Sequence, residues 1–139
     1  MWRRTRAGVA RRPVILVVED DPDIREMIAQ MLQMRDFDVF TAGTAVDALM
    51  VFRSRPGAID VLLTDVQLPG VSGRELARAV ESSRSRIPVV YISGVPQSSL
   101  ISRGLLRPAD LFLAKPYNSD TLISVLQSAL HQYAATPSR

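Results

Sequence analysis

The chain has 139 residues, of which 47% are hydrophobic and 22% charged, a composition typical of one globular domain with little room for a second. It contains no cysteine, which excludes a disulfide framework, a thiol nucleophile and a zinc site with cysteine ligands. No apolar run reaches the roughly 18 to 20 residues of a membrane span, and no signal peptide is evident. We therefore expect a cytoplasmic protein without a membrane span.

Charge is distributed unevenly along the chain. Five arginines lie in residues 1–12, whereas residues 13–139 hold twelve basic and fourteen acidic side chains, a net charge of −2. Because residues 1–12 also lack hydrophobic periodicity, we expect a disordered basic arm there, a single domain over residues 13–134 and a short tail over residues 135–139. Lys115 is the only lysine among the 17 basic residues, so chemistry that needs an ammonium group has one candidate.

Short apolar runs alternate five times with segments of helical period. The run at 14–18 is apolar throughout, as in a strand buried on both faces. Pro22 suits the first turn of the following helix, whose apolar residues recur at helical spacing over 24–32. The later elements, in chain order, are expected as a strand at 39–41, a helix capped by Thr44, a strand at 59–64, a helix capped by Ser72 and Glu75, a strand at 88–93, a weakly patterned helix near 98–103, a strand at 111–114 and a helix capped by Asn118 or Ser119. This alternation predicts an α/β protein with a doubly wound parallel sheet and five helices.

Polar side chains stand at the ends of four of the five expected strands. They are Glu19, Asp20, Asp65, Ser93 and Lys115. Ligands of such sheets bind beyond the carboxyl ends of the strands, so we expect these side chains to meet at one edge. Clustered carboxylates repel one another unless a cation neutralises them, and oxygen ligands alone favour Mg²⁺. Lys115 is then available to balance the negative charge of a phosphoryl group.

Four motifs at these strand ends closely resemble the receiver domain of two-component response regulators. They are Val-Val-Glu-Asp-Asp at 17–21, Leu-Thr-Asp-Val-Gln-Leu-Pro-Gly-Val-Ser-Gly at 63–73, Val-Tyr-Ile-Ser-Gly at 90–94 and Leu-Ala-Lys-Pro-Tyr at 113–117. The resemblance covers residues 13–130, nearly the whole chain. It implies a flavodoxin-like (CheY-like) fold whose five strands lie in the order 2-1-3-4-5.

The resemblance also implies a chemistry for the strand ends. Asp65 would accept a phosphoryl group from a histidine kinase or a histidine phosphotransfer protein. Glu19, Asp20, Asp65 and the backbone carbonyl of Gln67 would hold Mg²⁺, and Lys115 would contact the phosphoryl oxygens. Phosphoryl transfer depends mainly on positioning and charge neutralisation, which this set of groups supplies. The chain would then be a signalling phosphoacceptor and not an enzyme that acts on a separate substrate.

A further part of the resemblance concerns the response to phosphorylation. Ser93 would donate its hydroxyl to the phosphoryl group, Phe112 would be the aromatic switch residue, and Pro116 would follow the lysine through a cis peptide bond. Glu19 stands where aspartate is frequent in the family, Ser93 where threonine is frequent and Phe112 where tyrosine is frequent. Phe112 therefore has no phenolic hydroxyl to form a hydrogen bond after it rotates.

Several functional alternatives stay open. Nine residues follow Leu130, too few for a DNA-binding or catalytic output domain, so we expect either a single-domain response regulator or the receiver of a hybrid histidine kinase. Met1 and the basic arm favour the first, as a monomer or a phosphorylation-dependent dimer. The sequence segments at 63–66 and 112–116 also resemble those of the receiver domain of a hybrid histidine kinase. A Mg²⁺-dependent small-molecule phosphohydrolase is disfavoured because Gln67 cannot act as a general acid. A nucleic-acid-binding module that uses the arm is disfavoured by the domain charge of −2.

Overall fold

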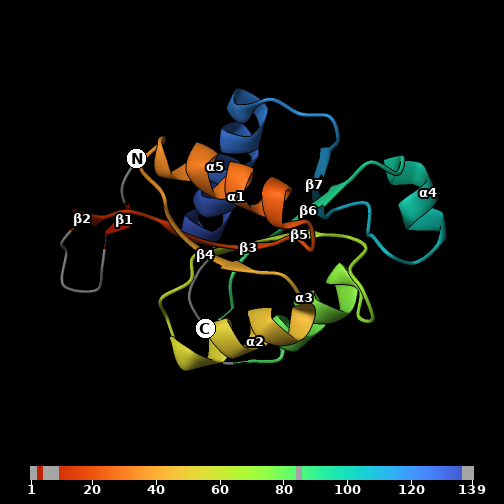
Figure 1. Ribbon diagram of the computed structural model, residues 1–139, viewed down its shortest axis with the longest axis horizontal. Coiled ribbons are helices and arrows are strands. Elements are labelled where there is room, and N and C mark those ends of the chain that lie inside the picture. The colour runs from red at the N-terminus through yellow and green to blue at the C-terminus, as the bar shows by residue number, and fades with distance from the viewer. Residues whose placement is uncertain (1–2, 5–9, 84–85, 136–139) are drawn as a thin grey trace.

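Parallel strands form the central layer of the molecule, which Figure 1 shows as a computed structural model. The structure describes residues 3–4, 10–83 and 86–135. The five strands of the main sheet are β3 (Val14–Val18), β4 (Asp38–Ala42), β5 (Val61–Asp65), β6 (Val89–Ser93) and β7 (Leu111–Ala114). They pair in parallel in the order β4-β3-β5-β6-β7. Counted along the chain within this sheet, the order is 2-1-3-4-5, which confirms the expected flavodoxin-like fold.

Helices cover both faces of this sheet. In the described residues they are α1 (Pro22–Gln33), α2 (Ala45–Ser54), α3 (Gly73–Glu81), α4 (Gln97–Ser102) and α5 (Ser119–Ala135). In Figure 1, α1 and α5 lie on one side of the sheet and α2 and α3 on the other, with α4 at the end near β6 and β7. The doubly wound arrangement with five helices is therefore confirmed. None of the helices in the described ranges is long and apolar enough to cross a membrane.

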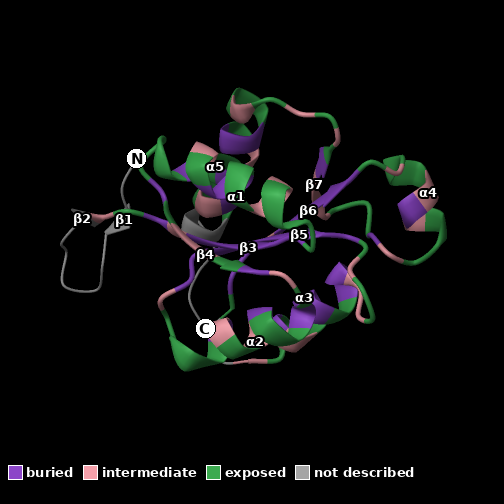
Figure 2. Cartoon of the chain, viewed as in Figure 1, coloured by how far each residue is buried: buried purple, intermediate pink, exposed green. Residues whose placement is uncertain are grey.

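The core forms because alternate residues of the central strands face opposite helical layers. Ile15 and Leu63 belong to the cluster with α1 and α5, whereas Leu16 and Leu62 pack with α2 and α3, and all four are fully buried. Figure 2 shows the central strands as the most continuously buried part of the chain. Burial of each such side chain contributes about 1.5–3 kcal/mol to folding, so the apolar runs that were apparent in the sequence are what anchor the strand ends.

Side-chain oxygens cap four of the five helices that the structure describes, including those expected at Thr44 and Ser72. Asp21, Thr44, Ser72 and Asn118 each accept a hydrogen bond from a backbone amide in the first helical turn. Of the two residues expected to cap the last helix, Asn118 is the one that does so. A cap of this kind contributes about 1 kcal/mol to stability. The short α4 has no such cap, which agrees with its weak sequence pattern.

The third strand of the sheet lies further along the chain than expected. The sequence predicted a strand at 59–64, but β5 runs from Val61 to Asp65. The carboxylate of Asp60 accepts a hydrogen bond from the Val14 amide at 2.8 Å. The side chain of Asp60 thus joins this segment to the start of β3 just before β5 begins at Val61. This shift places Asp65 inside the strand, as its last residue.

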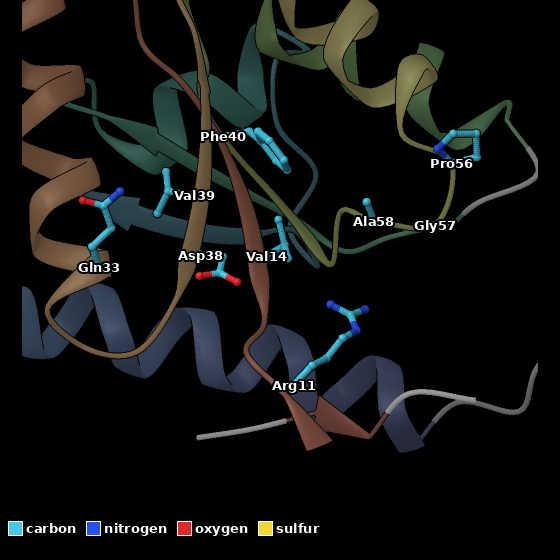
Figure 3. Close-up of a pocket in the computed structure, with 9 residues that line it drawn as sticks. All are labelled: Arg11, Val14, Gln33, Asp38, Val39, Phe40, Pro56, Gly57 and Ala58. Carbon is cyan, nitrogen blue, oxygen red and sulfur yellow. The ribbon is translucent and has the colours of Figure 1, made fainter. Parts of the chain in front are cut away.

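Part of the basic N-terminal segment is tied to the domain. Strands β1 (Arg3–Arg4) and β2 (Ala10–Arg11) pair antiparallel, and both terminal nitrogens of Arg11 lie 3.0 Å from the carboxylate oxygens of Asp60. Figure 3 shows Arg11 beside a shallow hollow of about 620 Å³ at this edge of the sheet. The division into arm, domain and tail stays a prediction. Residues 1–2, 5–9 and 136–139, on which much of it falls, lie outside the described residues.

Candidate functional site

The carboxyl ends of three strands bring the expected charged side chains together. Glu19 follows β3, Asp65 ends β5 and Lys115 follows β7. The Lys115 Nζ lies 3.2 Å from Asp65 Oδ1 and 3.6 Å from Glu19 Oε1. Both carboxylates are buried, with 3% of Glu19 and 8% of Asp65 exposed. The site therefore sets two buried acids against one partly exposed ammonium group.

A third carboxylate completes the acidic cluster. Glu19, Asp20 and Asp65 each offer a carboxylate oxygen, and these oxygens lie within 4.8 Å of one another. Asp20 is exposed, so one side of the cluster is open to solvent. Asp21, the next residue, instead turns its carboxylate to the amides of Asp23 and Ile24 at the start of α1. The cluster is thus separate from the cap of the helix that follows it.

One oxygen of the cluster has no hydrogen-bond partner among the described residues. Glu19 Oε2 accepts a hydrogen bond from the Asp21 amide at 3.0 Å, but Oε1 is buried and accepts none. A buried acceptor without a donor costs about 1–3 kcal/mol. Three carboxylates facing a single ammonium group also leave excess negative charge. An orphaned oxygen, an all-oxygen donor set and an open side fit a hard divalent cation such as Mg²⁺.

The electrostatics of the cluster are visible in the pKa values of its members. Burial, followed by the hydrogen bond and negative charge of Glu19, raises the pKa of Asp65 to about 7 although Lys115 opposes the shift. Burial also acts to raise the pKa of Glu19, but hydrogen bonds to Asp65 and the Asp21 backbone lower it overall. Burial acts to lower the pKa of Lys115, and the two carboxylates outweigh it, so this pKa is raised. Each shift reflects charges packed together with little water.

Close backbone packing fixes the position of Asp65. The Gly73 amide donates to the Val66 carbonyl at 2.8 Å, which brings the first turn of α3 against the end of β5. A Cβ atom at Gly73 would lie 2.1 Å from the Asp65 carbonyl oxygen, which is far inside van der Waals contact. Only glycine allows this approach. The glycine of the Ser72-Gly73 pair therefore serves the site and not only the turn.

Two residues that the sequence analysis did not single out also contact the site. Arg25 on α1 donates from Nη1 to the Glu19 carbonyl oxygen at 2.8 Å. This hydrogen bond joins α1 to the backbone at the end of β3. Burial, followed by the negative charges of Asp65 and Glu19, raises the pKa of Tyr117 to about 12. Arg25 lies on the polar side of an amphipathic helix, where periodicity carries no signal. Tyr117 was quoted only as part of a motif.

The remaining predicted site residues lie around the charged cluster. Ser93 is buried at the end of β6, and its Oγ accepts a hydrogen bond from the Val95 amide at 3.0 Å. Phe112 is half-buried and packs against the cluster that includes Tyr91. The bond between Lys115 and Pro116 is cis, as the resemblance implies. Gln67 is exposed two residues after Asp65; the roles of all these residues stay predictions.

The chain belongs to the response regulator receiver domain family, whose model matches residues 15–127. Among curated proteins it is 31% identical over 127 residues to the DNA-binding response regulator MtrA of Mycolicibacterium smegmatis, covering 91% of this chain and 54% of that protein. It is 29% identical over 118 residues to the cell cycle response regulator CtrA of Brucella ovis, covering 85% of this chain and 50% of that protein. The chain thus spans about half the length of these relatives.

Solved structures agree with this assignment. A sensor protein from Polaromonas sp. JS666 matches with a TM-score of 0.74 at 32% identity, over 87% of this chain and 98% of that one. The chemotaxis protein CheY4 of Vibrio cholerae matches with a TM-score of 0.71 at 28% identity, over 86% of this chain and 99% of that one. The matches cover almost the whole of each solved chain, so the similarity is to a complete receiver domain.

Proposed function

We propose that this receiver domain accepts a phosphoryl group on Asp65 from a phosphohistidine of a histidine kinase or a histidine phosphotransfer protein. The observation that carries the proposal is the buried Asp65 carboxylate, which lies between two further carboxylates and 3.2 Å from the only lysine of the chain. A structural carboxylate would be expected to have a full set of partners. This one shares a single ammonium group with Glu19 and lies in a cluster of three carboxylates, an arrangement suited to a cation and a phosphoryl group.

In the transfer step, a carboxylate oxygen of Asp65 forms a bond to phosphorus while the bond from phosphorus to the donor's imidazole nitrogen breaks. The electron pair of that bond stays with the nitrogen. Lys115 faces the oxygens that carry the charge, and its ammonium group compensates for it as the phosphoryl group arrives. Mg²⁺, held by Glu19, Asp20 and Asp65 with the carbonyl of Gln67, would neutralise the remaining charge.

The response to phosphorylation follows from the position of Ser93. In the unmodified chain its hydroxyl oxygen accepts from the Val95 amide, within its own loop. A phosphoryl group on Asp65 offers three strong acceptor oxygens, towards which the Ser93 hydroxyl can turn and donate. The loop after β6 would move with it, and Phe112 on the neighbouring strand would adjust. This is a shift between two conformations that a new local charge drives.

The place of the domain in a larger system is a separate part of the proposal. We favour a single-domain response regulator that controls a partner protein, with the receiver of a hybrid histidine kinase as the alternative. The aligned part of the chain spans about half the length of the relatives named as DNA-binding and cell cycle response regulators. The proposal also includes a cytoplasmic location and either a monomer or a phosphorylation-dependent dimer.

Intact mass spectrometry tests the phosphoacceptor directly. Incubated with acetyl phosphate and Mg²⁺, the wild-type chain should gain the mass of one phosphoryl group, and Asp65→Asn should gain none. Asp47→Asn, which alters an exposed aspartate on α2, is the matched control and should be phosphorylated like wild type. EDTA should suppress the reaction in both. An unchanged mass in wild type and control would overturn the proposal.

A further inference from the structure

A second charged group is buried away from the acidic cluster. Arg74, in the first turn of α3, has only 8% of its surface exposed. Its Nη1 donates to the Tyr91 hydroxyl oxygen at 3.1 Å and to Asp110 Oδ2 at 2.9 Å. The Asp110 side chain is also 8% exposed, so this is a buried ion pair between α3 and the segment before β7. The proposed chemistry at Asp65 uses none of these three residues.

Asp110 also closes the loop that leads into β7. Its Oδ2 accepts from the Arg107 amide at 2.7 Å, and its Oδ1 accepts from Arg107 Nε at 3.2 Å and Nη2 at 3.1 Å. Arg107 Nη2 lies 3.7 Å from Glu81 Oε2 at the last residue of α3. Both ends of α3 are therefore joined to the residues at 107–110. The two ion pairs restrict how this loop can move relative to the helix.

Stability alone is a weak reason for such an arrangement. Bringing a guanidinium and a carboxylate out of water costs about as much as their attraction returns, and apolar residues of similar size commonly serve as well. What a buried pair does add is a requirement for one geometry, because a shifted partner leaves a buried charge unmatched. The pair formed by Arg74 and Asp110 therefore restrains the arrangement of α3, β6 and the start of β7.

The residue at the centre of this arrangement is Phe112. Tyr91 on β6 is its direct partner in the β6–β7 ladder, and Phe112 packs against the buried cluster that contains Tyr91. Asp110 precedes Phe112 by two residues. Arg74 itself directly follows Gly73, whose backbone packs against the carbonyl group of Asp65. Arg74 thus connects the backbone beside Asp65 with Tyr91, the ladder partner of Phe112, and with Asp110, two residues before Phe112.

We propose that Arg74 is a positioning residue for Phe112, and that it acts through Tyr91 and Asp110 to hold the start of β7 in the conformation described here. Phe112 has no hydroxyl of its own to anchor it. The hydroxyl of Tyr91, the partner of Phe112 in the ladder, accepts from Arg74 and gives this part of the cluster a polar contact. The consequence for phosphorylation rests on the function proposed above, whereas the positioning of Phe112 does not.

The direction of the effect follows from where the contacts are made. All of these hydrogen bonds are made in the conformation described here, and the proposal is that a rearrangement of β7 on phosphorylation breaks them. If they are lost, the network opposes the phosphorylated conformation, and removing it must favour binding of a phosphoryl group by linkage. If they are kept, removal changes nothing. The proposal requires the first outcome.

The first measurement uses the unmodified protein. Hydrogen exchange and side-chain NMR relaxation are compared among wild type, Arg74→Lys, Arg74→Met and Tyr91→Phe. The control is Arg78→Met, an exposed arginine one turn later on α3. We expect the backbone amides of Arg107, Ala109 and Asp110 to exchange at least about tenfold faster in Arg74→Met and the Phe112 ring to become more mobile. Tyr91→Phe should make the Phe112 ring more mobile, with less effect on amide exchange in the loop at 107–110. Wild-type amide exchange and wild-type Phe112 ring mobility in Arg74→Met and Tyr91→Phe would overturn the positioning role.

The second measurement separates positioning from ordinary stability. Beryllofluoride with Mg²⁺, a phosphoryl mimic, is titrated into each folded variant, because global stability does not alter the affinity of a protein that stays folded. We expect Arg74→Lys and Tyr91→Phe to bind about fivefold to tenfold more tightly than wild type and Arg78→Met. Equal or weaker binding by these variants would overturn the inference. If wild type binds none, the phosphoacceptor proposal fails, and the exchange rates alone decide the role of Arg74.

Discussion

Strand β5 has a buried aspartate at each end, and the two are held in opposite ways. Asp60 immediately precedes the strand and is 3% exposed, whereas Asp65 is its last residue and is 8% exposed. The two residues flank or end the same strand, and both are buried aspartates. They differ in what surrounds the carboxylate, and that difference separates a structural acid from one suited to chemistry.

Asp60 has its charge matched by the protein. Both of its oxygens accept from the guanidinium of Arg11 at 3.0 Å, and Oδ2 also accepts from the Val14 amide at 2.8 Å. Figure 3 shows Arg11 reaching towards the domain from β2. A bidentate pair of this kind is strong and geometrically specific. It attaches the basic segment to the domain.

Asp65 has its charge only partly matched. One lysine lies 3.2 Å away, but Glu19 and Asp20 add two further carboxylates. The pKa of Asp65 is raised to about 7, first by burial and then by Glu19. A carboxylate left in this condition makes the folded chain less stable and makes binding of cations more favourable. The comparison teaches that the number of charge partners, and not burial, distinguishes these two aspartates.

The largest effect expected from this comparison is at Asp60. Asp60→Asn removes the charge that pairs with Arg11, and we expect the free energy of unfolding to fall by about 2–3 kcal/mol. Breaking a fully buried pair costs about 3–5 kcal/mol. The smaller value is expected because 31% of the Arg11 side chain is exposed. Urea denaturation measures the change.

The control for Asp60 is Asp38→Asn at the same edge of the sheet, where the side chain is exposed and lines the hollow in Figure 3. It should change stability by less than about 0.5 kcal/mol. A similar small loss for Asp60→Asn would mean that Arg11 adds nothing to folding, and the contrast between the two ends of β5 would disappear.

The same contrast shows which features were predictable from the sequence. Apolar runs indicated the sheet, and the residues after them, such as Asp65 and Lys115, indicated the site, because both follow from the period of a strand and the direction of the chain. Ion pairs such as Arg11 with Asp60, or Arg74 with Asp110, join residues 49 and 36 positions apart. Such pairs leave no periodic signal, since their geometry exists only once the sheet has formed.

The next effect has the opposite sign. In EDTA at pH 8, Asp65→Asn should raise the free energy of unfolding by about 1–2 kcal/mol, because it removes a charge that the fold disfavours. With a pKa of about 7 folded and 3.8 as the ordinary value, the folded chain holds more protons between these pH values. Wild-type stability should therefore decline, relative to the variant, as the pH rises from about 4 to about 7, and then level off.

Denaturation of both proteins across this pH range checks the slope. Asp47→Asn, exposed on α2, should follow wild type at every pH. A variant that is less stable than wild type at pH 8 would show that the ion pair with Lys115 outweighs the repulsion from Glu19. Asp65 would then resemble Asp60, and the distinction between the two ends of the strand would be lost.

The smallest expected effect is that of Mg²⁺. A ligand that binds only the folded chain at ten times its dissociation constant stabilises it by about 1.4 kcal/mol. Wild type should gain this in thermal denaturation, and so should Asp60→Asn at its lower baseline, because Asp60 lies at the far end of β5 from the cluster. Asp20→Asn, which removes the exposed carboxylate of the cluster, should lose most of the gain. An equal gain in all three proteins would place the bound cation elsewhere and leave the acidic cluster at Asp65 without the partner that its charge requires.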